Sequence, residues 1–121
     1  MPKMILIVDD STSIRQMVGY TLRQAGFGVI EGTNGQDALQ KLDGQRVELI
    51  ITDLNMPVMD GITFIKHVRS RTALRGTPVL MLTTESDDGK KKEGRAAGAT
   101  GWMVKPFKPD KLLETIARVL P

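Results

Sequence analysis

The sequence contains no cysteine and few aromatic residues: one Trp, one Tyr and three Phe among 121 residues. Without thiols it can form neither a disulfide framework nor a thiolate metal site. So few aromatic rings cannot build the stacking platform that binds single-stranded nucleic acid. The first apolar run, residues 4–8, ends on two aspartates and is far too short for a signal peptide or a membrane span. We therefore expect a cytoplasmic protein that binds neither membranes nor nucleic acid.

The excess of positive charge is confined to the last third of the chain. Residues 1–85 hold nine Lys and Arg against nine Asp and Glu, whereas residues 86–121 hold eight against five, which gives the net charge of +3. The densest basic run contains Lys90, Lys91 and Lys92. A lysine run of this length is more often a solvated helix face than a nucleic-acid patch. The basic pI therefore does not indicate a nucleic-acid partner.

Short apolar runs alternate five times with segments of helical periodicity. The expected strands are 4–8, 28–32, 48–52, 78–82 and 101–104. Because strands that are apolar on both faces need helices on both sides, the pattern predicts an α/β fold. A chain of 121 residues has the size of one domain. We therefore expect residues 1–121 to form a single doubly wound sheet of five parallel strands with helices on both faces.

Several residues indicate where the helices begin and which side of the first helix is buried. Ser11 or Thr12 is expected to cap the first helix, and Asn34 the second. Pro109 is expected in the first turn of the last helix. The first helix is expected to bury one stripe, made of Ile14, Met17, Val18, Thr21, Leu22 and Ala25.

Polar side chains follow four of the expected strands at the point where each strand ends. Asp9 and Asp10 follow the first, Asp53 the third, Thr83 the fourth and Lys105 the fifth. A single aspartate after a strand is usually a turn former or a helix cap. That explanation does not account for polar residues at so many strand ends, where the ligand sites of open α/β sheets lie. We therefore expect these side chains to gather in one pocket.

The charges in this pocket point to a magnesium-dependent reaction. Three neighbouring carboxylates repel each other unless a cation lies between them, and oxygen ligands suit a hard cation such as Mg²⁺. The three negative charges of the aspartates would be neutralised by Mg²⁺ together with Lys105. A carboxylate beside a metal ion and an ammonium group can attack a phosphoryl group to form an aspartyl phosphate. The sequence therefore predicts a site for phosphoryl transfer.

The motifs ILIVDDS (5–11), ITDLNMPVMDG (51–61), LTTE (82–85) and KPF (105–107) extend along most of the chain. In order and spacing they resemble the receiver domain of two-component response regulators, particularly the stand-alone chemotaxis regulators of the CheY type. The resemblance implies the flavodoxin-like strand order 2-1-3-4-5, which the pattern alone does not determine. It also implies a monomeric signalling switch that acts by binding, and not an enzyme apart from its own phosphorylation and dephosphorylation.

The resemblance assigns roles to the acidic residues of the pocket. It implies that Asp53 accepts a phosphoryl group from a histidine kinase or from a small donor such as acetyl phosphate. Asp10 and Asp53 would bind Mg²⁺ directly, and Asp9 would bind it through water. Asn55 would contribute its backbone carbonyl as a further metal ligand.

The resemblance also assigns roles to the residues that would surround the phosphoryl group. Thr83 and Lys105 would hold its oxygens, and a cis peptide bond between Lys105 and Pro106 would aim the lysine into the pocket. Asn55 and Glu85 occupy the two positions that tune water access in this family. Because both match the chemotaxis type, a short-lived phosphorylated state is expected.

An output surface formed by the fourth helix, fifth strand and fifth helix is implied as well. Trp102 stands where the family usually has the Tyr or Phe that changes rotamer as the hydroxyl group of Thr83 moves. The surface includes Lys90, Lys91 and Lys92, so a downstream protein with acidic character is expected, with the flagellar motor switch as the first candidate. A phosphatase is an optional further partner.

Three other functions fit parts of the pattern. A phosphorelay intermediate would use the same residues to pass the phosphoryl group on. A small Mg²⁺-dependent phosphohydrolase would turn over external substrates through an aspartyl phosphate, but such enzymes usually need a cap domain, for which 121 residues leave no room. A flavodoxin-like FMN carrier is disfavoured, because the FMN phosphate would meet three carboxylates and not a Gly/Ser/Thr-rich loop.

Overall fold

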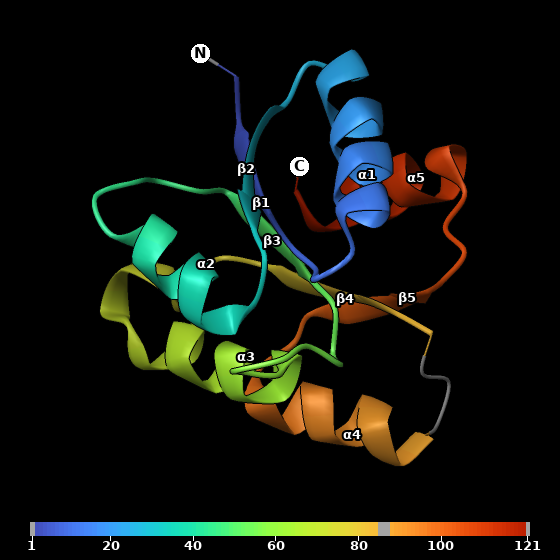
Figure 1. Ribbon diagram of the computed structural model, residues 1–121. Helices are drawn as coiled ribbons and strands as arrows, with labels where there is room; N and C mark the ends of the chain where they lie inside the picture. The colour runs from blue at the N-terminus through green and yellow to red at the C-terminus, as the bar shows by residue number, and fades with distance from the viewer. Residues whose placement is uncertain (1, 85–87, 121) are drawn as a thin grey trace.

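The computed structural model of the protein shows a five-stranded parallel sheet flanked by helices (Figure 1). The structure describes residues 2–84 and 88–120. The strands are β1 (Met4–Val8), β2 (Gly28–Gly32), β3 (Leu49–Thr52), β4 (Val79–Thr83) and β5 (Gly101–Val104). The helices are α1 (Thr12–Gln24), α2 (Gly35–Leu42), α3 (Gly61–Ser70), α4 (Asp88–Ala97) and α5 (Pro109–Val119), with the short 3-10 helix η1 (Thr72–Leu74) between α3 and β4.

The strand order in the sheet is β2-β1-β3-β4-β5, and each neighbouring pair is parallel. The α/β class and the implied order are therefore confirmed. The bounds expected for strands 4–8, 28–32 and 101–104 are confirmed as well, whereas the strand expected at 48–52 begins one residue later and the one expected at 78–82 lies one residue further along. The order reverses between β1 and β3, and ligand sites of such sheets lie at this reversal.

Each face of the sheet has its own hydrophobic core, because successive strand residues point to opposite faces. Leu6 and Ile50 face the side covered by α2, α3 and α4. Ile5 and Ile51, their neighbours in the chain, face the side covered by α1 and α5. This division explains why the strands are apolar on both faces.

The expected helix starts are confirmed. The side-chain oxygens of Ser11 and Asn34 accept hydrogen bonds, at 3.3 and 2.9 Å, from the backbone nitrogens three residues further on. Asp60 caps α3 in the same way at 2.8 Å, and Pro109 is the first residue of α5. Each such cap contributes about 1 kcal/mol to helix stability. The caps also fix the points at which the loops from the strand ends enter the helices.

The predicted buried stripe of α1 is only partly right. Val18 and Leu22 are fully buried, but Met17 is 54% exposed and Ala25 is exposed as well. The helix packs on β1, β2 and α5. Because these elements cover only one side of α1, the flank that carries Met17 faces solvent.

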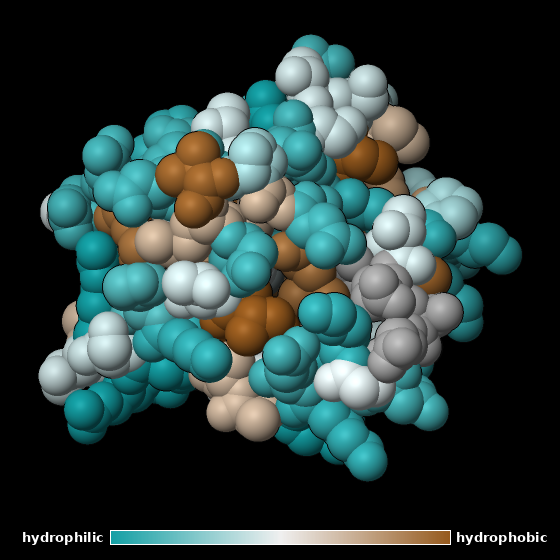
Figure 2. Space-filling view, turned by 60° about the horizontal axis from the view of Figure 1, so that its bottom comes forward, coloured by the Kyte–Doolittle hydropathy of each residue, from teal (hydrophilic) through white to brown (hydrophobic). Residues whose placement is uncertain are grey.

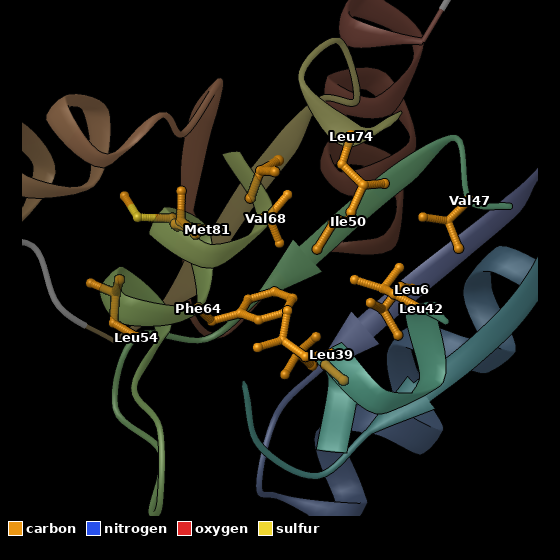
Figure 3. Packing of buried hydrophobic residues seen from close by; sticks show 14 residues of the cluster. Leu6, Leu39, Leu42, Val47, Ile50, Leu54, Phe64, Val68, Leu74 and Met81 are labelled. Carbon is orange, nitrogen blue, oxygen red and sulfur yellow. The ribbon is translucent and has the colours of Figure 1, made fainter. Parts of the chain in front are cut away.

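The core under α2 and α3 has Phe64 of α3 near its centre. Figure 3 shows the ring between Ile50 of β3 and Leu39 of α2. Phe64 has no exposed surface, and it is among the largest fully buried side chains of the described chain. Its ring therefore holds α3 and α2 against the same face of the sheet.

The surface on the side of α2, α3 and α4 is mostly hydrophilic, with small separate hydrophobic patches (Figure 2). Large exposed apolar side chains are few among the described residues: Met17, Tyr20, Val58 and Val104. None of the helices in residues 2–84 and 88–120 is long and apolar enough to cross a lipid bilayer.

The Phe64→Ala substitution should lower the free energy of unfolding by about 3–5 kcal/mol, because it leaves a cavity between α3 and the sheet. Urea denaturation followed by circular dichroism measures this change. Tyr20→Ala is the control, because Tyr20 is 66% exposed and its loss should cost no more than about 0.5 kcal/mol. Equal effects of the two substitutions would contradict the packing of α3 described above.

Candidate functional site

The expected polar residues meet at the carboxyl edge of the sheet. Asp9 and Asp53 follow the central strands β1 and β3, and Lys105 follows β5. The Lys105 Nζ atom lies 2.7 Å from Asp9 Oδ2 and 3.3 Å from Asp53 Oδ2. Asp9 is 2% exposed and Asp53 is 8% exposed. Lys105 therefore bridges two buried carboxylates, and its peptide bond to Pro106 is cis, as the resemblance implies.

Asp10 completes a group of three carboxylates. One oxygen from each of Asp9, Asp10 and Asp53 lies within 4.8 Å of the others, and Asp10 is exposed. The group contains only carboxylates among the described residues, with no histidine that would favour a softer metal. Carboxylate oxygens are the ligands that Mg²⁺ prefers. The residues present therefore fit a Mg²⁺ ion, and Asp10 is the one ligand of the three that is exposed to solvent.

The two buried aspartates are held by hydrogen bonds from the turns that follow them. Asp9 Oδ1 accepts a hydrogen bond from the Ser11 N–H at 2.9 Å. Asp53 Oδ1 accepts one from the Leu54 N–H at 2.8 Å. The backbone N–H of Asp9 donates to the carbonyl of Gly32 at 3.1 Å, so that the residue is tied to β2 as well. Both carboxylates are thus fixed before any ligand arrives.

The pKa values of Asp53 and Lys105 are both raised by their surroundings in the pocket. Burial raises the pKa of the Asp53 carboxyl group; Lys105 opposes this shift and the charge of Asp9 adds to it. Burial alone would lower the pKa of Lys105, but its hydrogen bond to Asp9 and the charges of Asp53 and Asp9 outweigh burial and raise it. Since three carboxylates face the single ammonium group of Lys105, a further cation at this edge would meet a net negative charge.

Gly61 allows the start of α3 to approach the backbone of Asp53. A Cβ atom on Gly61 would lie 2.1 Å from the Asp53 carbonyl oxygen and 2.9 Å from Leu54 Cα. The Gly61 N–H donates a hydrogen bond to the Leu54 carbonyl at 2.8 Å. Since only glycine permits this approach, Gly61 fixes the loop between Asp53 and α3.

The remaining expected pocket residues are placed only in part. Asn55 lies in the loop after Asp53 and is exposed. Thr83 ends β4 and is paired with Val104 of β5, so its backbone lies at the same edge of the sheet as the aspartates. The Thr83 side chain and Glu85 lie outside the described part of the structure. The roles of Asn55, Thr83 and Glu85 therefore stay predictions.

Trp102 lies on β5 against two cationic side chains of α4. Lys91 Nζ is 4.8 Å from the centre of the indole ring, and the guanidinium carbon of Arg95 is 5.3 Å from it. Cations at these distances are attracted to the face of an indole ring. Lys90 pairs with a glutamate of its own helix at 3.4 Å, and Lys92 is exposed. Of the three expected lysines, Lys91 is therefore the one whose ammonium group lies over the Trp102 ring.

Residues 5–117 match the model of the family described as the response regulator receiver domain. The matched span contains Asp9, Asp10, Asp53 and Lys105 in the arrangement given above. The chain belongs to the response regulator receiver family. Members of this family are signalling domains of two-component systems, and the chain is a receiver of the CheY type.

Relatives of known role include both chemotaxis proteins and transcriptional regulators. The chain is 37% identical over 118 residues to the chemotaxis protein CheY1 of Helicobacter pylori (strain ATCC 700392 / 26695), covering 96% of this chain and 95% of that protein. It is 35% identical over 120 residues to the phosphate regulon transcriptional regulatory protein PhoB of Escherichia coli (strain K12), covering 99% of this chain and 52% of that protein. It therefore spans about half of the transcriptional regulator and nearly all of the chemotaxis protein.

Solved structures agree with this assignment. The chemotaxis response regulator CheY4 of Vibrio cholerae has 52% identity and a TM-score of 0.94, with 99% of this chain and 100% of that chain covered. The receiver domain of a signal transduction histidine kinase from Syntrophus aciditrophicus has 32% identity and a TM-score of 0.89, with 98% and 89% covered. The fold is therefore the flavodoxin-like fold of CheY.

Three residues around the site were missed by the sequence reasoning. Gly61 carried a signal, because a glycine between a loop and a helix often marks a close backbone approach. Arg95 could have been found four residues after Lys91, on the same side of a helix. Arg15 contacts the backbone of Asp9, but the sequence holds no signal for this contact, because Arg15 resembles any polar residue beside the apolar stripe of α1.

The Gly61→Ala substitution should lower the free energy of unfolding by about 1–3 kcal/mol, because the added Cβ must push the Asp53 backbone and α3 apart. Chemical denaturation measures the loss. Gly76→Ala is the matched control, since a Cβ at Gly76 meets no atom within 4 Å. A Gly61→Ala protein as stable as the control would show that α3 does not rest on the Asp53 backbone.

Proposed function

We propose that residues 1–121 act as one receiver domain of a phosphorylation-activated response regulator, in which Asp53 accepts a phosphoryl group. The observation that carries the proposal is the bridge from Lys105 to Asp9 and Asp53, with Asp10 completing the carboxylate group within 4.8 Å. The donor is a histidine kinase, as expected for a two-component receiver. A small donor such as acetyl phosphate reacts at the same residue.

The metal ligands are Asp10 and Asp53 directly, Asp9 through water, and Asn55 through its backbone carbonyl. Mg²⁺, when bound there, supplies positive charge to the oxygens of the transferring group. The three carboxylates carry three negative charges, which one Mg²⁺ and the ammonium group of Lys105 neutralise. This balance supports the choice of a divalent cation.

In the reaction, a carboxylate oxygen of Asp53 forms a bond to phosphorus while the bond from phosphorus to the donor nitrogen breaks. The electron pair of that bond returns to the imidazole ring of the kinase histidine. Lys105 and Thr83 donate hydrogen bonds to the phosphoryl oxygens. Because the transferring group needs little covalent help, positioning and charge neutralisation provide most of the rate enhancement.

The phosphorylated protein binds a downstream partner through α4, β5 and α5. Lys90, Lys91 and Lys92 supply positive charge on α4, which suits an acidic partner segment. The sequence identity of 37% to CheY1 and 52% to CheY4 supports a role in chemotaxis, with the flagellar motor switch as the partner. Asn55 and Glu85 tune hydrolysis of the phosphoryl group, to which a phosphatase can add.

A phosphorelay intermediate is the second candidate. It is favoured by the similarity to a receiver domain of a histidine kinase. The two functions differ in the fate of the phosphoryl group. Its transfer from Asp53 to a histidine of another protein would identify a relay, whereas release to water would identify a terminal regulator.

Millimolar MgCl₂ should raise the melting temperature of the wild type, because a ligand that binds only the folded state stabilises it by mass action. Asp10→Ala should abolish the increment and, by relieving repulsion, can raise the melting temperature without Mg²⁺. Asp43→Ala is the control, since Asp43 is an exposed carboxylate that pairs with Arg71 away from the site. The measurement is a thermal melt at several MgCl₂ concentrations, and no increment in the wild type would argue against the metal site.

Beryllofluoride with Mg²⁺, which mimics a phosphoryl group on aspartate, should shift or quench the fluorescence of Trp102, the single tryptophan. The response should vanish in Asp53→Asn and be much smaller in Thr83→Ala, because Thr83 relays the change to Trp102. Emission spectra of the three proteins test this. A response in Asp53→Asn equal to that of the wild type would refute Asp53 as the acceptor, and an undiminished response in Thr83→Ala would refute only the relay.

A further inference from the structure

Arg15 of α1 reaches back to the turn that carries the first two aspartates. Its Nη1 donates a hydrogen bond to the carbonyl oxygen of Asp9 at 2.6 Å. Its Nε donates to Glu31 Oε1 on β2 at 3.2 Å, and its Nη2 donates to Thr12 Oγ1 at 3.3 Å. The Arg15 side chain is only 12% exposed. The guanidinium group is therefore held in one orientation beside the acidic pocket.

The carbonyl that Arg15 binds belongs to the peptide unit between Asp9 and Asp10. Because this unit is planar, a bond that fixes its oxygen also fixes the direction in which Asp10 Cα continues. Asp9 has further restraints, from the Ser11 N–H and from Lys105. Within residues 2–84 and 88–120, the Asp10 carboxylate has no hydrogen bond or ion pair. The position of Asp10 therefore depends on the backbone of this turn.

We propose that Arg15 is a positioning residue for the Mg²⁺ site, which acts by holding the Asp9–Asp10 peptide so that Asp10 stays within reach of the cation. The inference rests on the proposed binding of Mg²⁺ by Asp10. Residues that orient metal ligands in this way typically contribute a factor of about 10–100 to metal affinity.

The charge of Arg15 and its hydrogen bond act in opposite directions on the affinity for Mg²⁺. A positive side chain near the pocket repels a cation, so removal of its charge alone would tighten binding. Removal of the hydrogen bond to Asp9 frees the turn and weakens binding. The sign of the change therefore separates positioning from electrostatics.

Isothermal titration calorimetry with MgCl₂ on the full chain tests the proposal. The Mg²⁺ Kd of Arg15→Met should rise about tenfold or more. Arg23→Met is the matched control: Arg23 also lies near Glu31, at 3.7 Å, and carries the same charge, but its known contact is to Glu31 and not to Asp9. The control should bind Mg²⁺ as tightly as the wild type or slightly more tightly.

Arg15→Lys keeps the charge but loses the planar fork, so its Kd should fall between those of the wild type and Arg15→Met. Arg15→Lys also serves as the test if Arg15→Met does not fold. In that case, a Mg²⁺ Kd of Arg15→Lys equal to that of the wild type would overturn the proposal. For a folded Arg15→Met, a Kd equal to that of Arg23→Met overturns it, even if thermal stability is reduced. A wild type that binds no Mg²⁺ overturns the proposed function itself, which is a different result.

Discussion

Repulsion among three carboxylates at one edge of the sheet is the constraint on which the site depends. Asp9 and Asp53 are buried at this edge, where water screens their charges poorly and the effective cost of an unpaired ion is several kcal/mol. Lys105 offsets part of this cost by lying between them, 2.7 and 3.3 Å from their oxygens. Lys105 therefore supplies one positive charge against three carboxylates, and the pocket keeps a net negative charge that favours a second cation.

The order of the strands determines how Lys105 reaches the two buried aspartates. Asp9 and Asp53 come from neighbouring strands, so the parallel register alone brings them together. Lys105 follows β5, which is separated from β3 by β4. Its long side chain must therefore extend across the carboxyl end of β4, where Thr83 lies. This crossing places any ligand of the aspartates close to both Lys105 and the end of β4, which is the arrangement that the proposed phosphoryl transfer needs.

The parts of the site that could be predicted from sequence are those set by local pattern. Alternating strands and helices place Asp9, Asp53 and Lys105 at strand ends, and parallel strands bring such ends to one edge. The strand order needed the resemblance, because alternation is compatible with several orders. Arg15 acts through a contact with the backbone of Asp9, for which the sequence holds no local signal. Gly61 marks a close approach, but the sequence does not show that the backbone it approaches is that of Asp53. The exposure of Met17 likewise depends on where α1 lies on the sheet.

A short stretch of β5 links the pocket to the surface proposed for output. Trp102 lies three residues before Lys105, about 10 Å away along an extended strand. The ring packs against the core under α3 and against Lys91 and Arg95 of α4. Each cation–π contact at a partly exposed site is worth about 0.5–1 kcal/mol.

Two such contacts amount to about 1–2 kcal/mol, roughly a tenfold change in an equilibrium between two positions of the ring. In the proposed switch, a ligand in the pocket would therefore need only a small differential energy to move Trp102 away from α4. Lys91 belongs to the output surface proposed above, and Arg95 lies beside it on α4, so the proposed acidic partner would meet the same two cations. A partner that bound Lys91 and Arg95 would compete with the indole ring and would therefore favour the displaced ring. By reciprocity, if a ligand in the pocket raises the affinity for the partner, the partner raises the affinity of the pocket for that ligand by the same factor.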